Sequence, residues 1–303
     1  MKKAIVMLVL LLVLSCLCGT VVAESTDKIA GDGMQTVLVD HDGVRIYLTG
    51  KHTANDNLNG INGNYIIKLE CVVENNGTKP IGKVSYTGVI NGWSLGSGFI
   101  MSGTNDIQPG TKAKTDIWFG TEHTELTAYE QIKTMRLNVT VEDDKRNEIF
   151  TVRTDRVRFP NAVETPVVTY PDKRILIDRE DFCLYLTGNC IVKDKVNGIE
   201  GNYMINLECV IENKGKKMIG SVSYTGVVNG WSLGAGCIMS NTSNFQANTK
   251  VKTAIWFTTK DTDITCYEEV ESLDLTFTVK NKNRKEMFKE KANKVYFNGA
   301  NGK

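Results

Sequence analysis

The sequence predicts an all-β protein made of two tandem antiparallel β-sandwiches, and three observations support this fold class. A gapless internal repeat divides most of the chain into two copies. Within each copy, apolar and polar residues alternate with a period of two, which is the pattern of half-buried strands. Turn signals such as Asn76-Gly77, Asn91-Gly92 and Pro109-Gly110 separate these strands.

The internal repeat is visible by direct comparison of the two halves. The segment NGINGNYIIKLECVVENNG at 59–77 returns as NGIEGNYMINLECVIENKG at 197–215, an offset of 138 residues. The same offset holds without a gap from 37–159 to 175–297, with roughly half of the positions identical. A repeat of this length is a whole domain rather than a unit of a solenoid.

The alternation defines the strands of each copy. In the first copy Tyr65, Ile67, Leu69, Cys71 and Val73 alternate with more polar neighbours. Seven or eight such strands in about 120 residues favour an antiparallel β-sandwich. We therefore expect sandwiches at 37–160 and 172–298. The linker at 161–171 and the residue before it hold three of the five prolines.

The N-terminus has the pattern of a signal peptide at 1–23. Lys2 and Lys3 precede an apolar run that ends at Cys18, and Ala23 is a small residue suited to the cleavage site. The run is too short to span a bilayer as a helix, because a span needs about 20 residues. We expect secretion, and the alternative is a lipid anchor on Cys16 within Val13-Leu14-Ser15-Cys16.

Composition excludes several classes of partner. The net charge is +1 and charged residues make up 23% of the chain. Such a balance gives no electrostatic footprint for nucleic acid or for an anionic membrane surface. Contact with a membrane is expected only through the leader or the lipid anchor, and no cofactor is expected.

Short motifs recur in both copies. In the first copy they are Asp40, Glu74-Asn75 with Lys79, and Pro109-Gly110 with Lys112. The second copy matches at Asp178, Glu212-Asn213 with Lys217, and Lys250, but it has Ala247-Asn248 where the first has Pro-Gly. These motifs resemble those of the uncharacterised immunoglobulin-like domains of Gram-positive secreted proteins and lipoproteins. The resemblance implies an immunoglobulin-like fold and a cell-surface setting, and it implies no activity.

Catalytic and metal-binding patterns are poorly supported. The three histidines, His41, His52 and His123, all lie in the first copy, so the copies cannot share a histidine-based or zinc site. The G-x-G patterns at 96–98 and 234–236 open no amphipathic helix, which favours a strand turn or bulge over phosphate binding. We expect no catalytic residues and no metal site.

Six cysteines follow the leader. Cys71 and Cys209 occupy equivalent positions on an inward strand face, which indicates small buried thiols. The second copy adds four that could form up to two disulfides outside the cell, with unpaired thiols as the alternative: Cys183, Cys190, Cys237 and Cys266.

Paired aromatic residues are the candidate ligand-binding side chains. Alternation places Trp118 and Trp256 on an outward face, either as a ligand platform or beneath the following helical turn with Tyr129. Trp93 and Trp231 follow the Asn-Gly turns, and a place in the sandwich core is favoured for them over ligand binding. The last pair could extend either surface: Tyr86 and Tyr224.

The sequence thus predicts an exported, non-enzymatic binding module with an unknown extracellular ligand. A cell-wall polymer or glycan suits the outward tryptophans, and two similar domains would raise avidity for a repeated ligand. The alternatives are a protein-interaction or adhesion role, a structural spacer, and an enzyme or enzyme inhibitor.

Overall fold

The computed structural model describes residues 28–30, 35–55, 65–101, 106–163, 169–193, 202–238, 245–260, 262–264 and 266–297. The predicted leader at 1–23 and its Cys16 lie outside these residues. The described chain is all-β apart from short 3-10 turns such as η2 (Tyr129–Gln131) and η4 (Tyr267–Glu269). None of its helices is long and apolar enough to cross a membrane.

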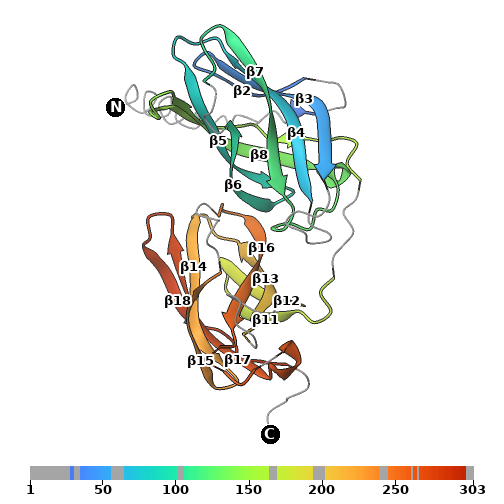
Figure 1. The fold of residues 1–303 in the computed structure, drawn as a ribbon, viewed down its shortest axis with the longest axis vertical. Coiled ribbons are helices and arrows are strands. Elements are labelled where there is room, and N and C mark those ends of the chain that lie inside the picture. Colours follow the sequence, from blue (N-terminus) through green and yellow to red (C-terminus); the bar gives the residue numbers. More distant parts are fainter. Residues whose placement is uncertain are drawn as a thin grey trace, which may run out of the picture.

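The first repeat folds as an immunoglobulin-like sandwich of two sheets (Figure 1). One sheet has the order β2-β3-β4-β7, and the other runs β10-β8-β5-β6, with β9 beside β8 and β1 parallel to β10. The strands are β1 (Lys28–Ile29), β2 (Thr36–His41), β3 (Val44–Asn55), β4 (Ile66–Asn75), β5 (Ile81–Ile90), β6 (Trp93–Met101), β7 (Thr111–Gly120), β8 (Thr134–Asp143), β9 (Glu148–Arg153) and β10 (Val157–Arg158).

The second repeat builds the same sandwich. Its sheets have the orders β11-β12-β13-β16 and β15-β14-β17-β18, with β19 beside β17. The strands are β11 (Arg174–Asp178), β12 (Phe182–Lys193), β13 (Met204–Asn213), β14 (Ile219–Val228), β15 (Trp231–Cys237), β16 (Thr249–Thr258), β17 (Ser272–Asn281), β18 (Glu286–Lys291) and β19 (Val295–Tyr296).

The period-two pattern seen in the sequence corresponds to burial in the strands. On β4 the residues Ile67, Leu69, Cys71 and Val73 are buried, and those between them are half-buried. One core cluster draws on residues from 30 to 159 and the other on residues from 176 to 297. Each repeat therefore buries a core of its own.

The asparagine of the Glu-Asn motif shared by the two copies has a structural role. Asn75 is buried, and its Nδ2 donates to the carbonyls of Lys79 and Ile107, both at 2.8 Å. Its Oδ1 accepts from the backbone N–H of Gly77 at 3.1 Å. Asn213 makes the equivalent bonds in the second repeat. The motif thus fixes the turn that follows the strand.

The β5–β6 hairpin places a tryptophan at the end of the first sandwich, and the β14–β15 hairpin does so in the second. Asn91 and Gly92 have positive φ angles of 50° and 82°, which suits a two-residue hairpin turn. Asn91 Oδ1 also accepts from the backbone N–H groups of Lys133 and Thr134 at 2.8 and 3.0 Å. The turn is thereby held against β8, and Trp93 follows it directly.

The two sandwiches meet at this hairpin. Lys250 of β16 pairs in parallel with Trp93 of β6, which joins one sheet of each repeat into a single ten-stranded sheet. Figure 1 shows β6 of the first sandwich facing β16 of the second.

Candidate functional site

Two tryptophans stand exposed on corresponding strands. Trp118 of β7 is 47% exposed and Trp256 of β16 is 41% exposed, whereas their neighbours Ile117 and Phe119 are buried. The helical turn does not cover Trp118. Its Tyr129 stacks on His52 instead, with ring centroids 3.4 Å apart. Of the two arrangements expected for these tryptophans, the structure has the outward, uncovered one.

Charged and hydrogen-bonding groups surround Trp118 on the same sheet face. Lys68 lies opposite it in register on β4, and Glu70 lies opposite Asp116. Lys114 Nζ is 2.6 Å from Glu70 Oε2, and this ammonium lowers the pKa of Glu70. A shallow hollow of about 430 Å³ occupies this face, lined by Gly50, Lys51, His52, Thr53, Lys68, Glu70 and Asp116.

The second repeat carries a less charged version of this face. Asn206 lies opposite Trp256, and Ala254 lies opposite Glu208. Glu208 Oε1 accepts from Thr187 Oγ1 at 2.8 Å and from Asn189 Nδ2 at 2.9 Å. Both repeats therefore set an exposed indole beside fixed polar groups, an arrangement that suits a ligand with apolar faces and hydroxyl groups.

Tyr86 and Tyr224 do not belong to a binding surface, and the expectation that they extend one is wrong. Both rings are buried in the core between the sheets. Their hydroxyls donate to the backbone carbonyls of Trp118 and Trp256 respectively. Burial raises the pKa of Tyr224 to about 12, so its hydroxyl stays protonated as a donor at neutral pH.

Each of these tyrosine rings packs so closely on the neighbouring strand that only glycine fits there. A Cβ on Gly98 would lie 2.5 Å from the Tyr86 ring, and one on Gly236 would lie 2.1 Å from Tyr224. The G-x-G pattern therefore gives the tyrosine space within the strand pair.

Trp93 and Trp231 differ in exposure and surroundings, although the sequences around them match. Trp93 is 4% exposed, but it packs outside both cores in a small cluster formed with residues of the second repeat. The partners in that cluster are Cys183, Tyr185, Val210 and Tyr170. Trp231 is 40% exposed. The expected place in a sandwich core is wrong for both, because the Asn-Gly turn presents the ring beyond the end of its own sandwich.

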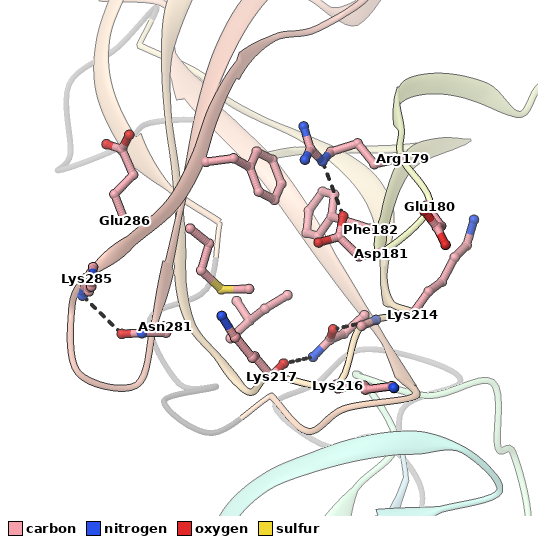
Figure 2. A pocket seen from close by; sticks show the side chains of 15 residues that line it. Arg179, Glu180, Asp181, Phe182, Lys214, Lys216, Lys217, Asn281, Lys285 and Glu286 are labelled. Atoms are coloured by element: carbon pink, nitrogen blue, oxygen red, sulfur yellow. Dashed lines mark hydrogen bonds and ion pairs between the residues drawn. The ribbon is translucent and has the colours of Figure 1, made fainter.

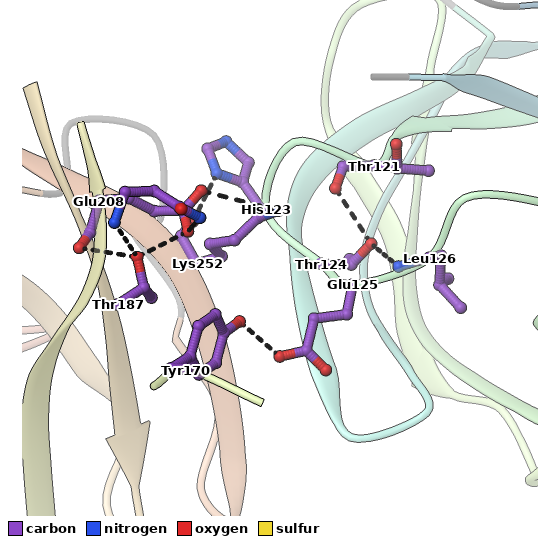
Figure 3. Close-up of polar contacts among 10 residues, drawn as sticks. Thr121, His123, Thr124, Glu125, Leu126, Tyr170, Thr187, Glu208 and Lys252 are labelled. Carbon is purple, nitrogen blue, oxygen red and sulfur yellow. Dashed lines mark hydrogen bonds and ion pairs between the residues drawn. The ribbon is translucent and has the colours of Figure 1, made fainter. Parts of the chain in front are cut away.

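Polar contacts complete the seam between the repeats (Figure 3). The backbone N–H of Lys250 donates to the carbonyl of Gly92 at 3.0 Å, and Lys250 Nζ lies 4.0 Å from the centroid of Trp93. The Lys252 N–H donates to the carbonyl of His123 at 3.1 Å, and His123 Nδ1 lies 3.0 Å from the Lys252 carbonyl. The seam thus combines backbone pairing with a buried aromatic ring.

The linker contributes a further contact. Tyr170 Oη donates to Glu125 Oε1 at 2.6 Å, and Figure 3 shows this bond bridging the two repeats. Burial and the neighbouring carboxylate of Glu125 raise the pKa of Tyr170. Sequence reasoning did not assign His123, Glu125 and Tyr170 to a contact between the repeats, because comparison of the two copies does not show which surfaces meet.

A second, larger hollow lies in the second repeat (Figure 2). It measures about 810 Å³, and its walls include Arg179, Lys214, Lys217 and Lys285. Ion pairs offset part of this positive charge. Arg179 lies 3.3 Å from Asp181 and 2.8 Å from Glu290, which also lowers the free charge available to an anionic ligand.

The structure distinguishes between the two states expected for the cysteines of the second repeat. Of the two alternatives, up to two disulfides or unpaired thiols, the structure has the second at Cys183, Cys190 and Cys266, whose thiols are free. Cys183 packs in the seam, and Cys237 is exposed. Cys71 and Cys209 are fully buried as expected, and burial raises the pKa of the Cys71 thiol to about 12.

Comparisons with known proteins leave the family open. No protein-family model and no curated protein matches the chain. Among solved structures, red sea bream transglutaminase aligns over 81% of this chain and 31% of its own at 11% identity, with a TM-score of 0.23. The Amycolatopsis orientalis exo-chitosanase CsxA aligns over 84% of this chain and 26% of its own at 11% identity, with a TM-score of 0.22.

A third structure is nearer in size. The fibronectin(III)-like modules of Clostridium thermocellum CbhA align over 76% of this chain and 84% of their own at 9% identity, with a TM-score of 0.17. These likenesses are too weak to carry an argument about function.

Proposed function

We propose that the protein is an exported, non-enzymatic binding module whose ligand is a glycan or cell-wall polymer. The observation that carries this proposal is the pair of exposed indoles, Trp118 and Trp256, each set beside fixed polar groups on a rigid sheet. The leader pattern at 1–23 supports export.

The chemistry of the face around Trp118 fits a carbohydrate. An indole presents a flat apolar surface to the C–H face of a sugar ring, and the carboxylates of Glu70 and Asp116 accept hydrogen bonds from hydroxyls. Lys68 and Lys114 supply donors within the same face. Two such faces on one chain would strengthen binding to a repeating polymer by avidity.

A binding assay with a double tryptophan variant and a single-substitution control tests the proposal. The protein would be titrated with soluble oligosaccharides and incubated with insoluble cell-wall polymers. We expect Trp118→Ala with Trp256→Ala to weaken binding at least about tenfold, a loss of about 1.4 kcal/mol. Trp231→Ala is the matched control, because Trp231 is equally exposed but lies on a hairpin away from this face.

Folding of each variant would be checked by circular dichroism and thermal unfolding. The proposal is overturned if no polymer or oligosaccharide binds, or if the double variant binds as tightly as the unaltered protein. Equal losses in the double variant and in Trp231→Ala would also contradict it, because the sheet face would then have no special role.

A further inference from the structure

The seam joins two different surfaces of the repeated sandwich. The first repeat contributes its turn end, which we define as Asn91-Gly92-Trp93 with His123. The second contributes its sheet face, defined by Tyr185, Val210, Lys250 and Lys252. Because the two surfaces differ, the seam uses the turn end of the first repeat and the sheet face of the second. The turn end of the second repeat and the sheet face of the first are left over.

The leftover turn end belongs to the second repeat, and its Asn229-Gly230-Trp231 segment has the same construction as 91–93. Asn229 and Gly230 have positive φ angles of 48° and 86°. Asn229 Oδ1 accepts from the N–H groups of Glu271 and Ser272 at 2.8 and 2.9 Å. Trp231 follows this turn at 40% exposure, compared with 4% for Trp93 in the seam. A preformed docking element is thus presented to solvent.

The leftover sheet face belongs to the first repeat, at Tyr47, Val72, Lys112 and Lys114. Tyr47 is as buried as its counterpart Tyr185, at 5% exposure each. The side chain of Lys114 is less covered than its counterpart: it is 63% exposed, whereas Lys252 in the seam is 22% exposed. Val72 is half-buried, whereas Val210 beneath Trp93 is fully buried.

The backbone of this face is also available. β7 is the edge strand of its sheet and has the same register with β4 as β16 has with β13. The N–H groups of Lys250 and Lys252 donate across the seam, so those of Lys112 and Lys114 point outward from the sheet in the same way. Outside the strand ladders, no backbone carbonyl of the described residues accepts a hydrogen bond from either N–H group.

One substitution distinguishes the leftover face from the face in the seam. Arg45 stands where the second repeat has Cys183, and its guanidinium lies 5.6 Å from the centroid of Tyr47. A guanidinium of this kind can stack on an incoming indole. Asp263, which is exposed on the second repeat, stands in the place of Glu125.

We propose that the turn end of the second repeat docks on the sheet face of the first repeat of a second copy, so that chains associate head to tail. The contact would repeat the seam already present within the chain, with Trp231 over Tyr47 and Val72. Such a contact joins two different surfaces, so an open assembly keeps one unfilled surface of each kind at its ends. It therefore builds linear assemblies, or rings where the two ends meet, rather than dimers that pair the same surface of both copies.

Sedimentation velocity over a concentration series tests this association. The protein would be purified from its producing cells, with its N-terminus processed as those cells process it. We expect the average mass to rise above that of one copy as concentration increases. Trp231→Ala should remain a single copy at every concentration. Trp256→Ala, which removes an equally exposed indole outside the docking surfaces, should associate like the unaltered protein.

A mixing experiment tests the two-surface arrangement directly. Val72→Glu places a charge on the sheet face and leaves the turn end intact, and Trp231→Ala does the reverse. Each variant alone should stay a single copy, whereas the mixture should form complexes of two copies and no larger. Lys112→Glu, at an exposed site, serves as the second sheet-face variant if Val72→Glu does not fold.

Head-to-tail association is overturned if the unaltered protein stays a single copy throughout, or if the mixed variants form no complex. An equal effect of Trp231→Ala and Trp256→Ala would also overturn it. Glycan binding has a separate readout and is tested at Trp118 and Trp256, whereas association is tested at Trp231 and Val72, so either proposal can fail while the other stands.

Discussion

Replacing Trp93 with alanine should release the two repeats from each other without unfolding either one. Trp93 is 4% exposed in the seam, whereas the equivalent Trp231, which is not docked, is 40% exposed. A tryptophan buries roughly 150–250 Å², and apolar burial is worth about 25 cal/mol per Å², so the hidden third contributes roughly 1.5–2 kcal/mol. The Lys250 ammonium above the ring adds about 1 kcal/mol.

The loss should appear in the seam because Trp93 packs apart from both cores. Its apolar partners are Tyr170, Cys183, Tyr185 and Val210, all from outside the first sandwich. Small-angle X-ray scattering should therefore show a longer and more variable molecule for Trp93→Ala. Calorimetry should show two less coupled transitions with little change in the enthalpy of each.

Trp231→Ala is the matched control for this measurement. It removes the same side chain after the same Asn-Gly turn, but Trp231 makes no part of the seam. Both variants would be compared at low concentration, where copies stay separate. If Trp93→Ala and Trp231→Ala give the same scattering profile as the unaltered protein, the indole does not hold the repeats together and the reasoning fails.

Three further predictions concern the first sandwich. Burial raises the pKa of the Cys71 thiol from 9.0 to about 12, so as pH rises the unfolded chain loses this proton before the folded chain does. The free energy of unfolding in urea should therefore fall between about pH 9 and 12, and it should fall less in Cys71→Ala. Asn75→Ala leaves buried carbonyls without donors and should cost about 2–3 kcal/mol in denaturant unfolding. Gly98→Ala places a methyl 2.5 Å from the Tyr86 ring and should cost at least about 2 kcal/mol, measured the same way.

Exposed neighbours supply the controls for the last two changes. Asn76→Ala and Ser97→Ala alter adjacent surface residues and should change stability by less than about 0.5 kcal/mol. A loss in either control as large as in its buried neighbour would contradict the assigned contacts. For Cys71, an unchanged pH dependence in Cys71→Ala would show that other groups determine the alkaline loss.

Much of the fold could be predicted because its signals are local and regular. The alternation along 65–73 gives strand and face together, and the same parity places Trp118 outward. Tyr86 was harder to place, since a tyrosine suits either a surface or a core. Its partner is a backbone carbonyl on the opposite sheet, 32 residues away, which no side-chain pattern reveals.

The seam could not be predicted from the repeat itself. Trp93 and Trp231 have the same neighbours in sequence and the same turn, yet one is buried and the other exposed. The difference arises from which repeat comes first, so comparison of the copies hides it. The sequence left disulfides and free thiols as alternatives in the second repeat, because cysteine content alone says nothing about distances between thiols.

The tyrosine hydroxyls have a consequence for solubility. The carbonyl of Trp118 lies on an edge strand, where an unfilled acceptor invites a strand from another molecule to add to the sheet. Tyr86 fills that acceptor from inside the sandwich, and Tyr224 does so for Trp256. An exposed apolar ring can thus stand on a sheet edge without that part of the backbone becoming a template for amyloid-like growth.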